Sequence, residues 1–373
     1  MWTLFLHLPD RYLIGMGLWL GALLFAPRWL LKLRWRFREQ PQRRRAVHAG
    51  LSAWFVFGVL TAIELGFALL YDTTDSFDMT NVSHRWFEVH VAPDLKPLAF
   101  KDGSGIEYRD DREFPSSVDA VRKHLCFLGD SFTFGHGVPH VSDRFSNQLQ
   151  NRLDSQPKTA SKYIVSNLSK PGSDLLWGEA VLTRLYAEHQ RIDTAVYVLC
   201  LNDIEMFHDR RMDFNNELAA LRNRPSFFLW RDSYFFNWSY YRVSLLSQSN
   251  VRNYYDFVRD FYAGPAWTRF EETLLRVDQL VAQHDSNFVV VIFPFLHNLG
   301  DQYPFADIHH QIATACDQHS IGCVDLLPRL QAAARDGKRL TVNPFDAHPN
   351  ELAHRIVADE LLRQFGQIDS AKK

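Results

Sequence analysis

Residues 124–135 read HLCFLGDSFTFG and place a serine, Ser131, directly after a run of apolar residues. The run from His124 to Leu128 has the length and composition of a buried strand. A strand-to-helix turn at this point would present Ser131 at the carboxyl edge of a sheet, where open α/β sheets place their sites. Gly-Asp-Ser alone is common in unrelated turns, so a functional assignment also needs matching residues elsewhere in the chain.

Short apolar runs and amphipathic stretches alternate from about residue 120 onward. This alternation is typical of a parallel sheet covered by helices. We therefore expect an α/β fold, a three-layer α/β/α domain over residues 121–368 with a central parallel sheet. The other expected strands are Tyr163–Ser166, Ala195–Cys200, Phe288–Phe293 and Ile321–Val324, and the expected helices include Leu175–His189, Trp267–His284 and Glu351–Phe365.

Three more polar blocks follow the expected strands or precede the last helix. Residues 167–172, NLSKPG, form a glycine loop that can point a free N–H, and Asn202 with Asp203 follows the third strand. Asp346 and His348 stand just before the final helix. Acyl transfer by a serine needs a nucleophile, a base, a group that orients the base, and donors for an oxyanion. The four blocks offer each of these parts.

In this order the blocks resemble those of the SGNH hydrolases, also called the GDSL-like family, and most of all its membrane-tethered bacterial members. The resemblance covers about residues 106–365, including the lead-in Tyr108–Arg112. It implies Ser131 as nucleophile, His348 as general base and Asp346 as the group that orients the base. It also implies an oxyanion hole made of the Ser131 N–H, the Gly172 N–H and the Asn202 side chain.

Two departures from the family pattern bear on these roles. The family commonly separates its acid and histidine by two residues, whereas only Ala347 stands between Asp346 and His348. Asp346 could then orient the base poorly, with a backbone carbonyl in its place. Cys200 stands where a glycine often precedes the Asn-Asp pair.

Other polar residues near the blocks are expected to have structural roles. Asp130 and Asp203 fit turn caps better than catalysts. Several histidines are expected at the surface or as caps: His136, His354, His309 and His310. The sequence predicts no metal site and no cofactor.

The first 71 residues are expected to form a transmembrane helical hairpin. Residues 51–71 contain one charge, Glu64, and are long enough to cross a hydrocarbon core of about 30 Å. An earlier apolar run, extended over residues 12–31, could also span; a secretory signal is the competing interpretation, but a cationic lead and a clear cleavage site are lacking. Aromatic residues near the ends of the second run, Trp54 and Tyr71, fit a membrane interface.

The segment between the two runs is strongly basic. It holds one acid, Glu39, and these cations: Lys32, Arg34, Arg36, Arg38, Arg43, Arg44 and Arg45. The positive-inside rule puts this loop in the cytoplasm and everything after residue 71 outside it. We therefore expect a bacterial inner-membrane protein whose catalytic domain is extracytoplasmic.

Three hairpin residues could contact a membrane protein partner. Gly17 and Gly21 have the GxxxG spacing that permits close helix approach. Glu64 is costly in lipid, so it should face the partner helix, a second protein or water. The formal net charge of −2 gives no reason to expect nucleic-acid binding.

Two regions outside the hydrolase blocks are distinctive. Residues 72–120 are polar and are expected to form a juxtamembrane extension. Residues 204–265 are dense in aromatic residues and arginine. This segment could form a lid over the site, which we favour, a membrane-facing surface or additional core. Cys316 and Cys323 could pair in an exported domain, which the sequence cannot decide.

The resulting hypothesis is a membrane-anchored serine esterase that acts through an acyl-serine on an acylated envelope glycan or lipid. One alternative is an O-acyltransferase that modifies an envelope polysaccharide with a membrane partner. The other is an inactive glycan-binding or scaffold protein that keeps the fold.

Overall fold

The computed structural model describes residues 2–115, 121–157, 159–223 and 226–371. Two compact units divide the chain. The first is Met1–Val89 together with Leu218–Gln248, and the second is His90–Glu217 together with Ser249–Lys373.

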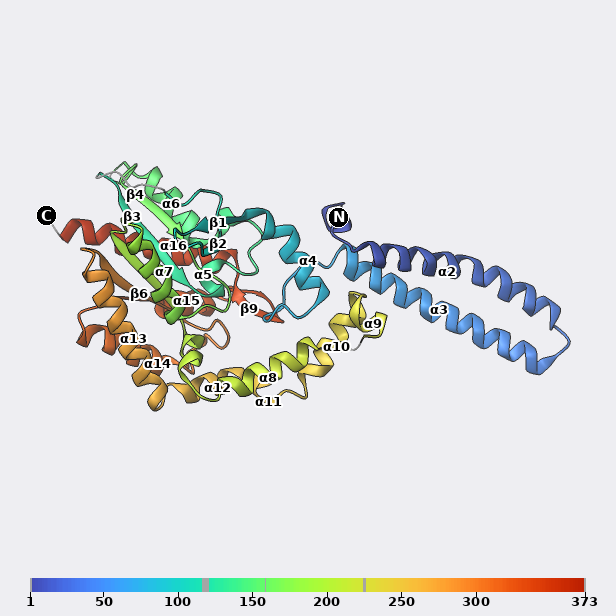
Figure 1. Cartoon of the computed structure of the whole chain (residues 1–373). Helices are drawn as coiled ribbons and strands as arrows, with labels where there is room; N and C mark the ends of the chain where they lie inside the picture. Colours follow the sequence, from blue (N-terminus) through green and yellow to red (C-terminus); the bar gives the residue numbers. More distant parts are fainter. Residues whose placement is uncertain (1, 116–120, 158, 224–225, 372–373) are drawn as a thin grey trace. The chain divides into compact units, whose positions relative to one another are not determined.

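A five-stranded parallel sheet forms the centre of the second unit (Figure 1). Its order is β4-β3-β5-β6-β7, and every neighbouring pair is parallel. The strands are β3 (Lys123–Gly129), β4 (Tyr163–Asn167), β5 (Thr194–Cys200), β6 (Asn287–Phe293) and β7 (Gly322–Asp325). All five match the strands expected from the apolar runs. Continuous apolar runs are what a sheet covered on both faces requires.

Helices cover both faces of this sheet. β4 lies on one side of β3 and β5 lies on the other, so the chain crosses the sheet in opposite directions in its first two connections. Because such crossovers are right-handed, the two connecting helices lie on opposite faces of the sheet. α6 (Phe145–Ser155) packs with α16 (Glu351–Ala371), while α7 (Leu175–Ala187) packs with α13 (Pro265–Ala282). α14 (Ala306–Gln318) and α15 (Leu327–Arg335) complete the layers. The expected three-layer α/β/α domain is confirmed.

Two small antiparallel hairpins stand outside the central sheet. β1 (Leu95–Ala99) pairs with β2 (Gly105–Arg109), and β8 (Thr341–Asn343) pairs with β9 (Asp346–Pro349). Neither hairpin was expected from the sequence. β9 holds the Asp346–His348 block, so it positions part of the candidate site.

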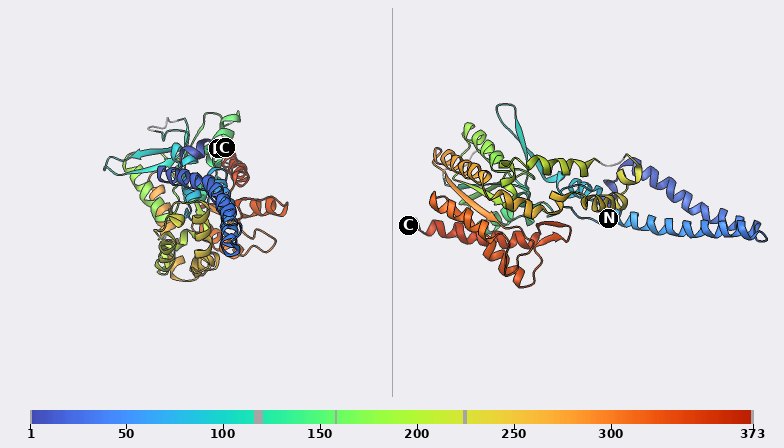
Figure 2. Two further views of the ribbon diagram at one scale, coloured as in Figure 1. Left: turned by 90° about the vertical axis from the view of Figure 1, so that its right-hand side faces the viewer. Right: turned by 90° about the horizontal axis from the view of Figure 1, so that it is seen from below.

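The first unit contains a pair of long helices that run side by side, as the views in Figure 2 show. These are α2 (Asp10–Arg36) and α3 (Pro41–Leu69), preceded by the short α1 (Trp2–Leu6). Both long helices have the length and composition to cross a membrane. They extend beyond the apolar runs, so most of the basic residues lie on the last turns of α2 and the first turns of α3.

Pro27 lies inside α2 and leaves one carbonyl without its usual donor. Proline has no N–H, so the carbonyl of Leu23, four residues earlier, receives no intrahelical hydrogen bond from it. The indole Nε1 of Trp54 on α3 donates to the Leu23 oxygen at 2.8 Å. This interhelical bond satisfies the freed carbonyl, which is how proline is tolerated in apolar helices.

Glu64 is buried in the first unit and accepts three hydrogen bonds. Tyr12 Oη of α2 donates to its Oε1 at 2.9 Å. The backbone N–H of Tyr234 donates to Oε1 at 2.7 Å, and that of Phe235 to Oε2 at 2.9 Å. Of the three surroundings open to Glu64, the structure shows the other helix of the hairpin, together with the start of α10. No atom lies within 4 Å of a Cβ built on Gly17 or Gly21, so these glycines leave an open helix face.

The aromatic-rich region 204–265 is divided between the two units. Its elements are η3 (Leu201–Phe207), α8 (Arg211–Arg222), α9 (Phe228–Arg231), α10 (Phe235–Leu245), α11 (Ser249–Arg252) and α12 (Tyr254–Phe261). Residues 218–248 group with the hairpin, through contacts such as those of Glu64 with the start of α10. α12 packs on η3 in the second unit. Cys316 and Cys323, like the other two cysteines, are free thiols.

Candidate active site

Ser131 follows β3 at the carboxyl edge of the sheet. The turn requires Gly129, whose φ is +153°, because a Cβ there would lie 2.7 Å from the Val198 carbonyl of the neighbouring strand β5. Asp130 caps the short α5 (Ser131–Phe134), accepting a hydrogen bond from the Phe132 N–H at 2.9 Å. The glycine lets the chain turn against β5, and the aspartate fixes the direction in which Ser131 leaves the sheet.

The β8–β9 hairpin brings Asp346 and His348 to the same place. Side chains two residues apart in a strand lie on the same face, so one intervening residue suffices for contact. His348 Nδ1 lies 2.6 Å from Asp346 Oδ1, and the His348 backbone N–H donates to the same oxygen at 3.0 Å. With the Nδ1 proton directed at Asp346, Nε2 accepts from the Ser131 hydroxyl at 2.8 Å. The short Asp-Ala-His spacing thus permits a continuous Asp346–His348–Ser131 chain of hydrogen bonds.

The three donors expected for an oxyanion hole follow three neighbouring strands. Ser131 follows β3, Gly172 lies in the loop after β4, and Asn202 follows β5. Gly172 has a φ of +72°, which only glycine adopts readily. Neither the Ser131 N–H nor the Gly172 N–H donates a hydrogen bond to another described residue. The Asn202 side chain lies against the Asp130 carboxylate.

Asp130 and Asp203 act as caps, as expected. Asp203 accepts from the Cys200 N–H at 3.2 Å and from the Tyr197 hydroxyl at 2.7 Å. Burial raises the pKa of Asp130, and burial together with the nearby Asp130 charge raises the pKa of Asp203 well above its ordinary value. Their hydrogen bonds fix the two turns that carry Ser131 and Asn202.

Two buried arginines hold the loop that follows Ser131. Arg109 of β2 donates to the carbonyls of Gly135 and Pro139, each at 3.1 Å. Arg144 donates to the Phe134 carbonyl at 3.3 Å and pairs with Asp110 at 3.3 Å. Burial lowers the pKa of Arg109 to about 10. The lead-in noted in the sequence therefore contributes Arg109 and Asp110 to the support of the site.

His136 is the site residue that sequence reasoning missed. It was expected at the surface or as a cap, but it is 2% exposed and its Nε2 lies 3.7 Å from Asp346 Oδ2. Its ring centroid is 4.4 Å from that of His348. Gly137, with a φ of +82°, forms the turn after it, against Val342 of β8. The Gly-His-Gly run at 135–137 was the available signal, because it places a histidine between two flexible residues close to the serine.

Of the other histidines expected at the surface or as caps, His309 and His354 are buried, and His354 caps the start of α6. His309 Nδ1 lies 2.8 Å from Asp325, and His354 Nδ1 accepts from the Phe145 N–H at 3.3 Å. Burial and the nearby arginines lower the pKa of His354 to about 3. Both side chains are held by these hydrogen bonds in the interior of the second unit.

The one group of described residues with metal-ligand geometry overlaps the candidate triad. The nitrogen and oxygen atoms of His136, Asp346 and His348 lie within 4.8 Å of one another. Both His348 nitrogens already have partners, Asp346 and Ser131. A metal here would have to displace one of these bonds, so the arrangement fits proton transfer better than metal ligation.

Comparison with known proteins finds likeness among solved structures. No family model and no curated protein matches the chain. One similar structure is a member of the lipolytic G-D-S-L family from Veillonella parvula DSM 2008, with 14% identity, a TM-score of 0.41, and coverage of 65% of this chain and 98% of that one. An acetylxylan esterase from Geobacillus stearothermophilus, solved as a catalytic mutant, has 15% identity, a TM-score of 0.41, and coverage of 65% and 94%.

A third similar structure is a two-domain esterase active on acetylated mannans. It has 13% identity and a TM-score of 0.38, with coverage of 67% of this chain and 50% of that one. In the present chain, the four blocks stand in the family's order, and each follows a strand of the parallel sheet or lies in β9. The second unit is a three-layer α/β/α domain with a central parallel sheet, and its four blocks resemble those of the SGNH hydrolases.

Proposed function

We propose that this protein is a serine esterase that forms an acyl-serine intermediate on Ser131. The observation that carries the proposal is the 2.8 Å hydrogen bond between Ser131 Oγ and His348 Nε2, continued at 2.6 Å from His348 Nδ1 to Asp346. A nucleophile in contact with a base that is itself oriented by a third group is the arrangement that activates serine.

In the proposed acylation step, Ser131 Oγ attacks the carbonyl carbon of an ester while His348 Nε2 takes the hydroxyl proton. Asp346 holds the imidazole and stabilises the imidazolium that forms. The oxyanion is stabilised by the N–H groups of Ser131 and Gly172 and by the Asn202 amide. The tetrahedral intermediate then expels the alcohol, which receives its proton from His348.

In the proposed deacylation step, water attacks the acyl-serine. His348 takes a proton from the water as the C–O bond forms. Collapse of the second tetrahedral intermediate breaks the bond to Ser131 Oγ, which regains its proton from His348 and releases the acid. The same donors serve both steps, because the oxyanion occupies the same position in each.

We also propose that the hairpin anchors the enzyme in a bacterial inner membrane with the catalytic unit outside the cytoplasm. Two helices of spanning length and the basic segment between them support this topology through the positive-inside rule. An enzyme held there would meet acylated envelope glycans and lipids, so an ester of that class is the proposed substrate.

The test uses detergent-solubilised full-length protein with a fluorophosphonate probe and p-nitrophenyl acetate. Wild type should label and turn over, whereas Ser131→Ala and His348→Ala should do neither. Ser247→Ala and His310→Ala are matched controls, since both residues are exposed and lie outside the site. Silence of the wild type would overturn the esterase proposal and bring forward an inactive binding or scaffold protein.

The acyl acceptor separates the esterase from the O-acyltransferase. Product analysis with and without added polysaccharide distinguishes them: free acid is expected from an esterase. Acylated polysaccharide formed in place of free acid would show a transferase.

A further inference from the structure

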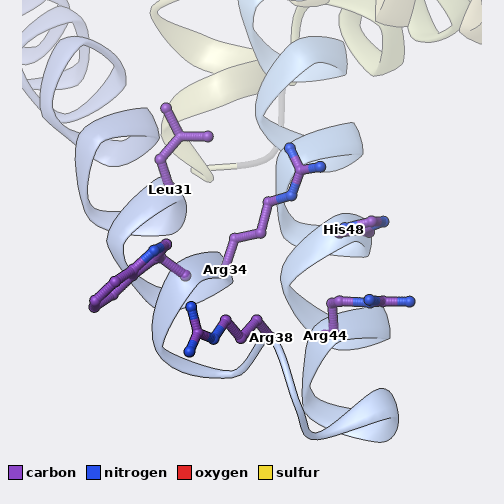
Figure 3. A pocket seen from close by; sticks show the side chains of 6 residues that line it. Leu31, Arg34, Arg38, Arg44 and His48 are labelled. Carbon is purple, nitrogen blue, oxygen red and sulfur yellow. The ribbon is translucent and has the colours of Figure 1, made fainter.

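Between α2 and α3, at the end where the two helices are linked, lies a cavity of about 540 Å³ (Figure 3). α2 and the link after it supply four lining residues, and α3 supplies two. The lining residues are Leu31, Arg34, Trp35, Arg38, Arg44 and His48. Residues 31, 34, 35 and 38 follow helical spacing and so form one stripe, with 44 and 48 one turn apart on the facing helix.

The charge of this cavity is one-sided. Three guanidinium groups line it and no carboxylate does. The single acid of the segment, Glu39, has an exposed side chain and pairs with Arg38 at 3.4 Å. Arg38 also lies over the Trp35 ring, 5.4 Å from its centroid. One of the three arginines is therefore already engaged.

Arg34 and Arg44 are the two guanidinium groups left for a ligand. Neither makes an ion pair or a side-chain hydrogen bond with another described residue. Figure 3 shows Arg34 reaching from α2 toward α3. Guanidinium groups bind phosphate oxygens in bidentate pairs, and their charge is permanent at any physiological pH.

Besides the arginines, His48 and two apolar side chains line the cavity. The Leu31 and Trp35 side chains are largely exposed, and the apolar stretch of α2 continues from them. A ligand that fills the site would thus place an anionic group on Arg34 and Arg44 and a hydrocarbon part along Leu31 and Trp35. This combination is the chemistry of an anionic phospholipid at the membrane interface.

We propose that this cavity is a binding site for the headgroup of an anionic phospholipid. The inference rests on the membrane anchoring given under the proposed function. It goes beyond the positive-inside rule, because that rule needs only net charge in the segment. A site needs the particular arginines that line the cavity.

The test compares two double variants of equal net charge in the full-length protein. Arg34→Gln with Arg44→Gln removes the two free lining cations, and Arg36→Gln with Arg45→Gln removes two cations outside the lining. Native mass spectrometry in detergent then measures binding of cardiolipin, phosphatidylglycerol and phosphatidylcholine. Competition with inorganic phosphate separates a lipid site from a phosphate site.

The expected result is preferential binding of the two anionic lipids by wild type. The double substitution of Arg34 and Arg44 should weaken that binding by about tenfold or more. The control substitution of Arg36 and Arg45 should weaken it by less than about twofold. Equal losses in both pairs, no preference over phosphatidylcholine, or full displacement by inorganic phosphate would each overturn the proposal.

Turnover of p-nitrophenyl acetate serves as the folding control and should be unchanged in both double variants. This readout also separates the two proposals. If wild type binds anionic lipid but has no esterase activity, the proposed reaction fails while the lipid site stands.

Discussion

At the scale of single residues, the Asp346 carboxylate lies between two histidines. Its Oδ1 meets His348 at 2.6 Å, and its Oδ2 faces His136 at 3.7 Å. Asp346 is 1% exposed, so neither oxygen relies on bulk water. His136 can fix the rotation of the Asp346 carboxylate, and this rotation sets the orientation of the His348 ring. His136 is therefore a positioning residue in this account.

Replacement of His136 should affect turnover more than substrate binding. We expect His136→Leu to lower kcat by about tenfold, less than the loss of roughly a hundredfold or more for a direct oxyanion donor, with KM little changed. His136→Gln should recover most of the rate, because its amide N–H can face the Asp346 carboxylate as the imidazole does. Steady-state kinetics with p-nitrophenyl acetate checks this, and equal rates for both variants and wild type would contradict the assigned position.

At the scale of elements, the strand β9 explains why a single residue between the acid and the histidine suffices. Strand geometry alternates side chains between faces, and Asp346 and His348 share one face. The sequence alone gave no sign of β9, because the segment is short and contains a proline at 349.

Lengthening this spacing should abolish activity. Insertion of one glycine between Ala347 and His348 would move Asp346 to the opposite face of the strand, and we expect kcat/KM to fall by about a hundredfold or more. Ala347→Gly keeps the register and serves as the control. Full activity of the insertion variant would show that Asp346 does not orient the base.

Glu64 joins the hairpin to the segment 218–248 within the first unit. Glu64→Gln replaces one acceptor oxygen by a donor, so at least one of the bonds to Tyr12, Tyr234 and Phe235 is lost. A buried donor left without its partner costs about 1–3 kcal/mol, so this segment should become more sensitive to protease. Limited proteolysis of the full-length protein tests this, with Glu39→Gln as the exposed control. An unchanged cleavage pattern would mean that Glu64 does not fix the segment.

Much of the fold could be predicted because apolar runs report burial directly. All five strands of the central sheet were predicted, as were α7, α13 and α16, since each run is long enough to show its period. The β1–β2 and β8–β9 hairpins were missed because short strands lack a clear period. His136 was missed for a different reason: its neighbours in sequence are glycines, and its burial depends on β8 and β9, which lie two hundred residues later.

At the scale of the whole molecule, buried titratable groups couple stability to pH. Burial raises the pKa of Glu205 in η3 to about 7 from the ordinary 4.5. The folded state then holds a proton that the unfolded chain releases between these values, so this group's contribution to stability is lost as pH rises from 4.5 through 7. His297 and His354 act in the opposite direction, because burial lowers their pKa to about 4 and about 3.

Comparison with Glu205→Gln isolates the contribution of this one carboxyl group. Relative to the variant, wild type should lose up to about 3 kcal/mol of unfolding free energy between pH 5 and pH 8. Urea unfolding of the detergent-solubilised protein at both pH values measures this difference. A difference between the two proteins that does not change with pH would show that Glu205 titrates normally.

The division into two units is a second property of the whole molecule. The sequence predicted the hairpin and the hydrolase-like domain, but it treated residues 204–265 as one insertion. The structure assigns residues 218–248 to the unit of the hairpin. That assignment depends on contacts such as the one between Glu64 and the start of α10, some 170 residues apart, which no local pattern reveals.

Catalysis through an ester of Ser131 can be tested by trapping that ester. Wild-type protein mixed with p-nitrophenyl acetate is quenched in acid within the first turnover, digested and examined by peptide mass spectrometry. We expect one added acetyl group on the peptide that contains Ser131, and none on the corresponding peptide of Ser131→Ala. Turnover with no acetyl group on Ser131, or with the acetyl group on another residue, would contradict it.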